Sequence, residues 1–233
     1  MCEDKALGYA TGFFYRDSRE NLYLGTNKHV LFSDQDETIP DTMNLYLHND
    51  LKNSSYKVYS VQLFSAAGDA QWIEHPEDKD IDLILIPLIE KSVEKNYIIE
   101  AWSKHTTLPS EYTLYTDQSV SVIGFPFNLF DKKKYLPVYL NAKISSVYTR
   151  GYPYFLIEAD LPTGASGSPV IIEYGGSSLK TIENEKEINE ISWKIIGIYS
   201  STFYLDTDDG NEESLGLGIT WYIHHIEKIV NSL

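Results

Sequence analysis

The chain has 233 residues, enough for one sizeable domain or two small ones that share an interface. Hydrophobic residues make up 42% and aromatic residues 13%, with 18 tyrosines, so a disordered chain is excluded and a strand-rich core is favoured. The formal net charge of −15 repels nucleic-acid phosphates and anionic membranes, so we expect neither as a partner, and the single cysteine, Cys2, excludes a disulfide within the chain.

Short apolar or alternating runs, separated by turn residues, recur along the chain and predict strands. In chain order, the predicted strands lie near residues 8–15, 22–26, 44–47, 56–63, 83–88, 120–123, 138–146, 154–158, 169–173, 193–200 and 216–220. Many short strands with turns between them are typical of an all-β sandwich or barrel. No linker rich in Pro, Gly or Ser argues for independent domains.

Two segments have apolar residues at roughly helical spacing instead. Residues 90–102 fall in the middle of the chain, where a connection between two halves would lie. Residues 221–230 lie at the end of the chain, and a lone helix there usually docks on the body of the domain. Two charged segments, residues 180–190 and 206–213, are predicted to be solvated surface loops.

The motif with the most specific chemistry is at residues 163–170 (TGASGSPV). A nucleophilic serine needs an exposed hydroxyl and nearby backbone N–H groups for the developing oxyanion. The glycines on both sides of Ser166 allow the sharp turn that brings such groups close. On its own, the stretch also fits an ordinary turn before a strand. The G-x-S-x-G elbow of the α/β-hydrolases is not met, because Ser168 occupies the place of its last glycine.

A histidine follows the strand predicted at residues 22–26, within the segment 24–30 (LGTNKHV). The pKa of an imidazole lies near neutrality, so His29 can move a proton to and from a serine. A structural or incidental histidine is the alternative interpretation of this motif when it is taken alone.

An aspartate opens the apolar run of residues 80–88 (DIDLILIPL). A carboxylate at the start of a buried strand is costly unless another group pairs with it, which makes Asp82 a partner for the histidine. Asp80 is the alternative, because it lies two residues earlier and on the same face of an extended chain. A surface turn that caps a strand would also explain the motif alone.

Together, these motifs resemble those of the chymotrypsin-like serine peptidases. The serine segment is similar to the G-x-S-G-S-P form of the glutamyl endopeptidases, and the histidine segment to the T-N-x-H-V form of the high-temperature-requirement proteases. The order His29, Asp82, Ser166 is that of the chymotrypsin family and differs from that of the subtilisins and the α/β-hydrolases.

The resemblance implies an all-β fold of two six-stranded antiparallel β-barrels with a C-terminal α-helix. Residues 1–233 would form one trypsin-like peptidase domain. Residues 1–100 would form the N-terminal barrel with the histidine and the aspartate, residues 101–220 the C-terminal barrel with the serine, and residues 221–233 the helix. The site would lie in the cleft between the barrels.

The resemblance also implies a serine endopeptidase that needs no cofactor. Ser166 would be the nucleophile, His29 the base and then the acid, and Asp82 the group that orients the imidazole. The backbone N–H groups of Gly164 and Ser166 would form the oxyanion hole. The alternative from another class is a catalytically inactive, protease-like module that binds proteins.

Residues of the substrate-binding strands follow from the same resemblance. Tyr199, Ser200 and Ser201 resemble the strand that pairs with the substrate backbone, and Gly218 lies on the strand that lines the far side of the specificity pocket. Asp160 has the place of the pocket-floor aspartate of trypsin-type enzymes, which would favour Lys or Arg before the scissile bond. A preference for small, apolar or acidic residues is the alternative.

The chain departs from secreted relatives in two respects. Ala165 stands where trypsin-type zymogens carry the aspartate that captures a freed N-terminus, so that activation switch is absent. With one cysteine and no apolar signal segment, a cytoplasmic location is expected. The expected partners are a protein or peptide substrate and a regulatory partner or fused effector domain. Analogy with trypsin-like domains of bacterial immunity operons suggests an antiviral defence effector or activator.

No metal site is expected. His224 and His225 are adjacent, so on the predicted helix their side chains point in different directions. The other histidines show no spacing typical of metal ligands.

Overall fold

The computed structural model describes residues 8–32, 39–50, 52, 55–88, 92–108, 112–129, 136–146, 152–174, 192–206 and 212–233. Cys2, the predicted loop at residues 180–190 and most of the predicted loop at residues 206–213 lie outside the described residues.

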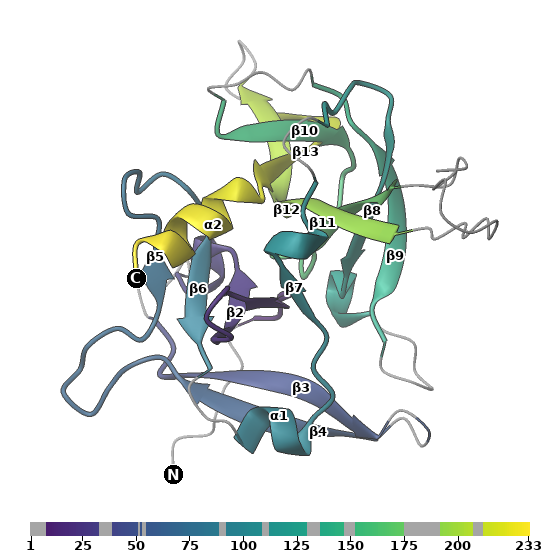
Figure 1. Cartoon of the computed structure of the whole chain (residues 1–233). Coiled ribbons are helices and arrows are strands. Elements are labelled where there is room, and N and C mark those ends of the chain that lie inside the picture. Colours follow the sequence, from purple (N-terminus) through teal and green to yellow (C-terminus); the bar gives the residue numbers. More distant parts are fainter. Residues whose placement is uncertain are drawn as a thin grey trace.

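Most of the described regular structure is β-strand (Figure 1). The strands are β1 Phe13–Arg16, β2 Leu22–Thr26, β3 Thr42–Asp50, β4 Ser55–Gln62, β5 Ile73–Glu74, β6 Ile84–Pro87, β7 Ala101–Ser103, β8 Ser119–Gly124, β9 Val138–Lys143, β10 Tyr154–Glu158, β11 Pro169–Tyr174, β12 Ser192–Asp206 and β13 Glu212–Tyr222. The α-helices are α1 Ser92–Asn96 and α2 His224–Asn231, and the short 3₁₀ turns are η1 Lys28–Val30, η2 Lys104–Thr106 and η3 Pro126–Asn128.

The strands form two main sheets, one in each half of the chain. The first is five-stranded, in the order β5-β6-β2-β1-β7, and is accompanied by the two-stranded hairpin β3-β4. The second is six-stranded, in the order β10-β13-β12-β11-β8-β9, and a bridge between Ile144 and Ile157 joins its two edges. The pairings between these strands are antiparallel except that of β1 with β7, which is parallel. The all-β prediction with a C-terminal helix is therefore confirmed.

The helix predicted at residues 90–102 is wrong in its second half. Only α1 is helical, and the chain then extends into β7. The apolar residues of this segment alternate between two cores: Ile99 and Ala101 pack against one cluster, and Trp102 packs against another. Pairing of Trp102 with Tyr15 of β1 holds this stretch as a strand, so tertiary contacts override the helical spacing. The last helix starts later than predicted, since Trp221 still belongs to β13.

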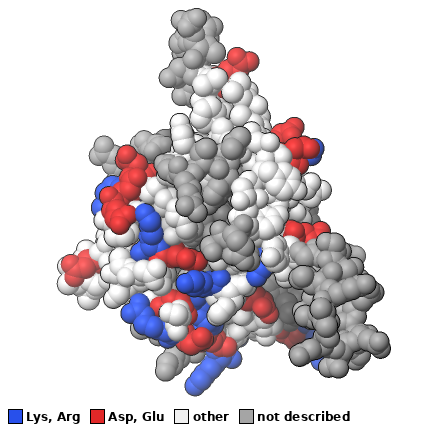
Figure 2. All heavy atoms as spheres, turned by 45° about the horizontal axis from the view of Figure 1, so that its top comes forward, with Lys and Arg blue, Asp and Glu red and all other residues white. Residues whose placement is uncertain are grey.

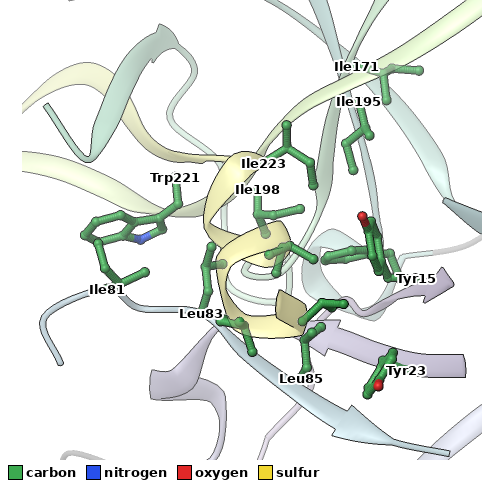
Figure 3. Close-up of a cluster of buried hydrophobic side chains, with 14 residues drawn as sticks. Tyr15, Tyr23, Ile81, Leu83, Leu85, Ile171, Ile195, Ile198, Trp221 and Ile223 are labelled. Atoms are coloured by element: carbon green, nitrogen blue, oxygen red, sulfur yellow. The ribbon is translucent and has the colours of Figure 1, made fainter. Parts of the chain in front are cut away.

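A core cluster of buried side chains joins the two sheets to α2 (Figure 3). Tyr15 and Tyr23 come from the first sheet, and Ile195 and Ile198 from the second. Helix α2 lies between the sheets, and the buried Ile226 of this helix belongs to the cluster (Figure 1). Burial of apolar surface from both halves against one helix stabilises their relative position. This arrangement matters for the site, because the predicted site residues come from both halves.

Charges of both signs are interspersed on the described part of the face in Figure 2. Basic and acidic side chains lie next to each other at its lower edge, and much of the remaining surface is uncharged. This mixture is typical of a solvated surface. Within the described residues, the helices are too short or too polar to cross a bilayer.

Two buried histidines link α2 to the loop that follows β5. The Nδ1 atom of His225 lies 3.4 Å from Nε2 of His75, and Nε2 of His225 lies 2.8 Å from the carbonyl oxygen of Pro153. The Asp78 N–H donates to Nδ1 of His75. Each ring therefore fits the neutral form: His225 donates through Nε2–H to Pro153, and His75 donates through Nε2–H to His225. Protonation of either ring would place a second hydrogen where an acceptor is needed.

Acidification is expected to destabilise the fold through His225. Burial lowers the pKa of His225 from 6.5 to about 4, so between these values the unfolded chain binds a proton that the folded chain does not. The free energy of unfolding should therefore fall as the pH drops from 6.5 toward 4, by about 2 kcal/mol at pH 5 from this residue. Urea unfolding at pH 8 and pH 5, for the wild type and His225→Gln, measures the effect.

The exposed His105 provides a control for the loss of a histidine as such, because His105→Gln should unfold at pH 8 with the same free energy as the wild type. An equal pH dependence in the wild type and in His225→Gln would contradict the expectation.

Candidate active site

His29 lies at the end of a fully buried strand. Every residue of β2 is buried, and the chain then turns through η1, which exposes the imidazole. Two bonds hold this turn against the segment before β6: Asn27 Nδ2 donates to the carbonyl oxygen of Asp82 at 2.8 Å, and the Lys28 N–H donates to the same oxygen at 3.4 Å. The turn therefore brings His29 next to residue 82.

The carboxylate of Asp82 binds His29 through both oxygens. Its Oδ2 lies 2.7 Å from Nδ1 of His29, and its Oδ1 accepts the backbone N–H of His29 at 2.8 Å. Ile81 and Leu83 are buried in the core cluster between the sheets, so the alternation of an extended chain turns the carboxylate the other way, toward the histidine. A carboxylate only accepts, so Nδ1 of His29 carries the hydrogen and Nε2 is left as the basic atom.

The structure brings Asp82, and not Asp80, to the histidine. Asp80 is exposed, and its backbone N–H donates to the side chain of Asp78 at 2.9 Å within the turn. Both aspartates fit the sequence pattern, and the contact with His29 distinguishes them.

Ser166 lies in a turn that needs its two glycines. Gly164 and Gly167 have φ of 96° and 84°, values that favour glycine. A side chain on Gly167 would also overlap the carbonyl oxygen of Thr11. The Ser166 hydroxyl is partly exposed and donates to the carbonyl oxygen of Ser200 at 2.9 Å, rather than to His29.

Ser200 links the serine to the aspartate, a role that sequence reasoning missed. Its carbonyl oxygen accepts from Ser166, and its own hydroxyl donates to Oδ2 of Asp82 at 2.6 Å. The sequence identified Ser200 only as a residue of the substrate-binding strand. A serine in a strand carries no local signal of a bond to a carboxylate that lies 118 residues earlier.

Two backbone N–H groups beside Ser166 are available for an external acceptor. Neither the Gly164 N–H nor the Ser166 N–H donates to any residue that the structure describes. The side chain of Ala165 between them is completely buried in the core of the second sheet. This turn is therefore anchored by apolar packing at the position where trypsin-type zymogens use an aspartate.

A cavity of about 350 Å³ adjoins Ser166. Asp160, Tyr199, Ser200, Ser201 and Thr202 line it, together with the aromatic rings of Phe127 and Tyr204. A larger hollow of about 670 Å³, on the outer face of β8, β9 and β11, contains none of the predicted site residues.

Asp160 is exposed and held by two hydroxyl groups. Thr202 Oγ1 donates to its Oδ1 at 2.9 Å, and Ser214 Oγ donates to its Oδ2 at 3.3 Å. These bonds fix a negative charge at the lining of the cavity. Gly218 lies behind this lining, where a side chain would overlap the ring of Tyr199. Its missing side chain therefore makes room for Tyr199.

Within the part of the chain that the structure describes, no group of three or more His, Cys, Asp and Glu side chains is arranged to hold a metal ion. The site consists of protein groups that can accept, donate and move protons.

Comparisons with known proteins identify the family and the fold of this chain. Residues 10–176 match the family of the trypsin-like peptidase domain, whereas no curated protein matches the chain. A crystal structure of the serine endoprotease from Yersinia pestis is similar with a TM-score of 0.51 and 16% identity, and the likeness covers 99% of this chain and 59% of that chain. The likeness confirms the predicted chymotrypsin-like fold, although the chain spans only about three fifths of that protein's length. Because the family match covers more than half of the 233 residues, the chain belongs to the family of the trypsin-like peptidase domain.

Proposed function

We propose that this chain cleaves protein substrates with Ser166 as nucleophile, His29 as proton carrier and Asp82 as the group that orients the imidazole. The observation that carries the proposal is the contact of 2.7 Å between Asp82 and Nδ1 of His29, at a site that Ser200 joins to Ser166 by its bonds to both Asp82 and Ser166. Asp82 holds the hydrogen on Nδ1, so Nε2 can accept the proton of the serine hydroxyl.

The reaction would proceed through an acyl-enzyme. Ser166 Oγ attacks the scissile carbonyl carbon while its proton moves to Nε2 of His29. The N–H groups of Gly164 and Ser166 stabilise the oxyanion that forms. The tetrahedral intermediate collapses as His29 protonates the leaving amine, and water then releases the acyl group by the same steps in reverse.

The resting position of Ser166 requires one rotation before this reaction. Its hydroxyl donates to the carbonyl oxygen of Ser200, so it must turn away from this oxygen to donate to Nε2 of His29. Rotamer changes of accessible side chains take picoseconds to nanoseconds and do not limit turnover. The same observation favours the second candidate, an inactive protease-like module that binds proteins, if the hydroxyl stays in place.

A fluorophosphonate probe separates the two candidates. Such a probe forms a bond between Ser Oγ and phosphorus and loses fluoride only at an activated serine. We expect the wild type to be labelled and Ser166→Ala to be unlabelled, as measured by intact mass. Ser168→Ala is the matched control, because Ser168 lies on the same turn but is completely buried. An unlabelled wild type would support the binding module, and labelling of Ser166→Ala would exclude this serine as the nucleophile.

We propose further that the enzyme prefers Lys or Arg before the scissile bond. The support is the position of Asp160 at the lining of the cavity next to Ser166, with two hydroxyl groups that hold its carboxylate. A cation in the cavity would meet a fixed negative charge, and the exposed ring of Phe127 offers a π face beside it.

The proposed cellular role is that of a cytoplasmic bacterial protease. A cytoplasmic location is supported by the presence of only one cysteine, and a role as a bacterial defence effector or activator rests on analogy with other trypsin-like domains. A regulatory partner or a fused effector domain belongs to the same analogy. Proteins that co-purify with Ser166→Ala from the native host would test it.

A further inference from the structure

Thr11 is a buried residue that binds the serine turn from the other half of the molecule. It is only 3% exposed and lies just before β1. Its hydroxyl donates to the carbonyl oxygen of Gly164 at 2.8 Å, and its backbone N–H donates to the carbonyl oxygen of Ser166 at 2.9 Å. Its own carbonyl oxygen accepts the hydroxyl of Thr26 at 2.8 Å, on the strand that leads to His29.

The hydroxyl of Thr11 has a second backbone partner. It accepts the N–H of Phe125 at 3.0 Å, at the start of the turn that contains η3. A single oxygen therefore binds both the serine turn and the turn that covers it. The surroundings of the Thr11 hydroxyl are tightly packed. A Cβ atom on Gly124 would overlap the side chain of Ser168 and lie 2.9 Å from the Thr11 hydroxyl oxygen.

The η3 turn also determines the direction of the Gly164 N–H. The Phe127 N–H donates to the carbonyl oxygen of Thr163 at 2.6 Å. Thr163 and Gly164 share one peptide plane, and in a trans peptide the C=O and N–H point in opposite directions. A carbonyl held by Phe127 therefore leaves the Gly164 N–H directed away from η3.

The N–H of Ser166 is oriented by the same principle. The carbonyl oxygen of Ala165 accepts the N–H of Ser168 at 3.0 Å, which fixes the peptide plane that carries the Ser166 N–H. This bond lies within the serine turn. The Gly164 N–H, by contrast, depends on η3 and hence on a contact from outside its own turn.

The η3 turn is costly to hold in this conformation. Phe127 and Asn128 both have positive φ, 52° and 53°, which L-residues rarely adopt. Such residues persist where surrounding contacts hold them in place. Phe127 is 76% exposed, so its own side chain adds little packing, although Pro126 is buried. The bonds from Phe125 to Thr11 and from Phe127 to Thr163 tie the turn to the domain body.

We infer that the Thr11 hydroxyl is a positioning group for the oxyanion site: it holds Gly164 and the η3 turn together, so that the Gly164 N–H points to the place where the oxyanion forms. The inference rests on the proposed function, since it assigns a task to a residue that does not touch the substrate. The N-terminal half would then supply a third residue to the reaction, since Thr11 would help to stabilise the transition state in addition to His29 and Asp82.

The test is Thr11→Val, which keeps the size and β-branching of threonine and removes the hydroxyl. Loss of one complete oxyanion donor costs about 10²–10³ in kcat, so a misplaced donor should cost about 10- to 100-fold. KM should change by less than about threefold, because the interaction acts mainly in the transition state. The readouts are kcat and KM for a fluorogenic peptide chosen from the wild-type cleavage profile, and the affinity of the matching peptide boronate, which forms a tetrahedral adduct with the serine.

Two further variants separate positioning from general stability. Thr11→Ser keeps the hydroxyl and should restore kcat to within about threefold of the wild type. Thr106→Val is the matched control, because the Thr106 hydroxyl also makes two backbone bonds, to Ser103, but outside the site. It should lower the melting temperature and leave kcat and boronate affinity unchanged. If Thr11→Val does not fold, Thr11→Cys provides the same comparison, since a thiol is a weak hydrogen-bonding group.

The outcomes are distinct from those for the proposed function. A wild type that resists the fluorophosphonate contradicts the proposed function and this inference together. An active wild type with an equally active Thr11→Val, or a variant in which only KM rises, overturns the inference and leaves the triad intact. A fall in kcat and boronate affinity that Thr11→Ser restores is the expected result.

Discussion

Asp82→Asn is expected to lower kcat/KM about 10⁴-fold at neutral pH while the protein stays folded. The carboxylate accepts from Nδ1–H and N–H of His29 and from the hydroxyl of Ser200. An asparagine of the same size has one acceptor oxygen and a donor NH₂ group, so one of these partners meets a donor instead. If the NH₂ group faces Nδ1, the imidazole hydrogen moves to Nε2, and His29 can no longer accept the proton of Ser166. Steady-state kinetics with a peptide substrate measure the loss.

Asp80→Asn is the matched control for this experiment. It removes the same charge two residues earlier in the chain, from an exposed side chain for which the structure records no contact with His29. We expect its kcat/KM to equal that of the wild type within about threefold. The opposite pattern, with a large loss in Asp80→Asn and a small one in Asp82→Asn, would reverse the assignment of the aspartate.

Asp160→Asn is expected to remove the proposed preference for Lys and Arg. A hydrogen bond to a charged group contributes about 1.5–3 kcal/mol, so kcat/KM for substrates with a basic residue should fall about 10- to 100-fold. Cleavage after other residues should change little. The Thr202 and Ser214 hydroxyls can each donate or accept, so they can hold the amide in place. A peptide-library cleavage profile of both proteins measures the change.

Glu158→Gln distinguishes a direct ion pair between Asp160 and a basic substrate side chain from long-range attraction by the negative charge of the protein. Glu158 is an exposed carboxylate two residues from Asp160, but it lines the outer hollow and not the cavity next to Ser166. Removal of its charge should leave the cleavage profile unchanged. A wild-type enzyme that is active and shows no enrichment of Lys or Arg would exclude the basic preference itself.

The residues of the candidate triad and most of the strands could be predicted from the sequence, because both are local features. Glycines around Ser166, an apolar run after Asp82 and the alternating side chains of β8 depend on neighbours in the chain. The helix predicted at residues 90–102 shows the limit of such patterns. Its apolar spacing fits a helix, but Trp102 pairs with β1 and the segment becomes a strand.

What only the tertiary structure decided lies in contacts between distant segments. Three such contacts shape the site: that of Asp82, rather than Asp80, with His29, that of Ser200 with Asp82, and the two bonds of Thr11 to the serine turn. They join residues that are far apart in the sequence, by 153 positions for Thr11 and Gly164. The sequence by itself determined which side chains can do the chemistry, because residue type and local spacing carry that information. The tertiary structure decided which of these side chains meet and in which direction the N–H groups of Gly164 and Ser166 point. Both depend on how the two halves pack around α2, and no local pattern in the sequence specifies that packing.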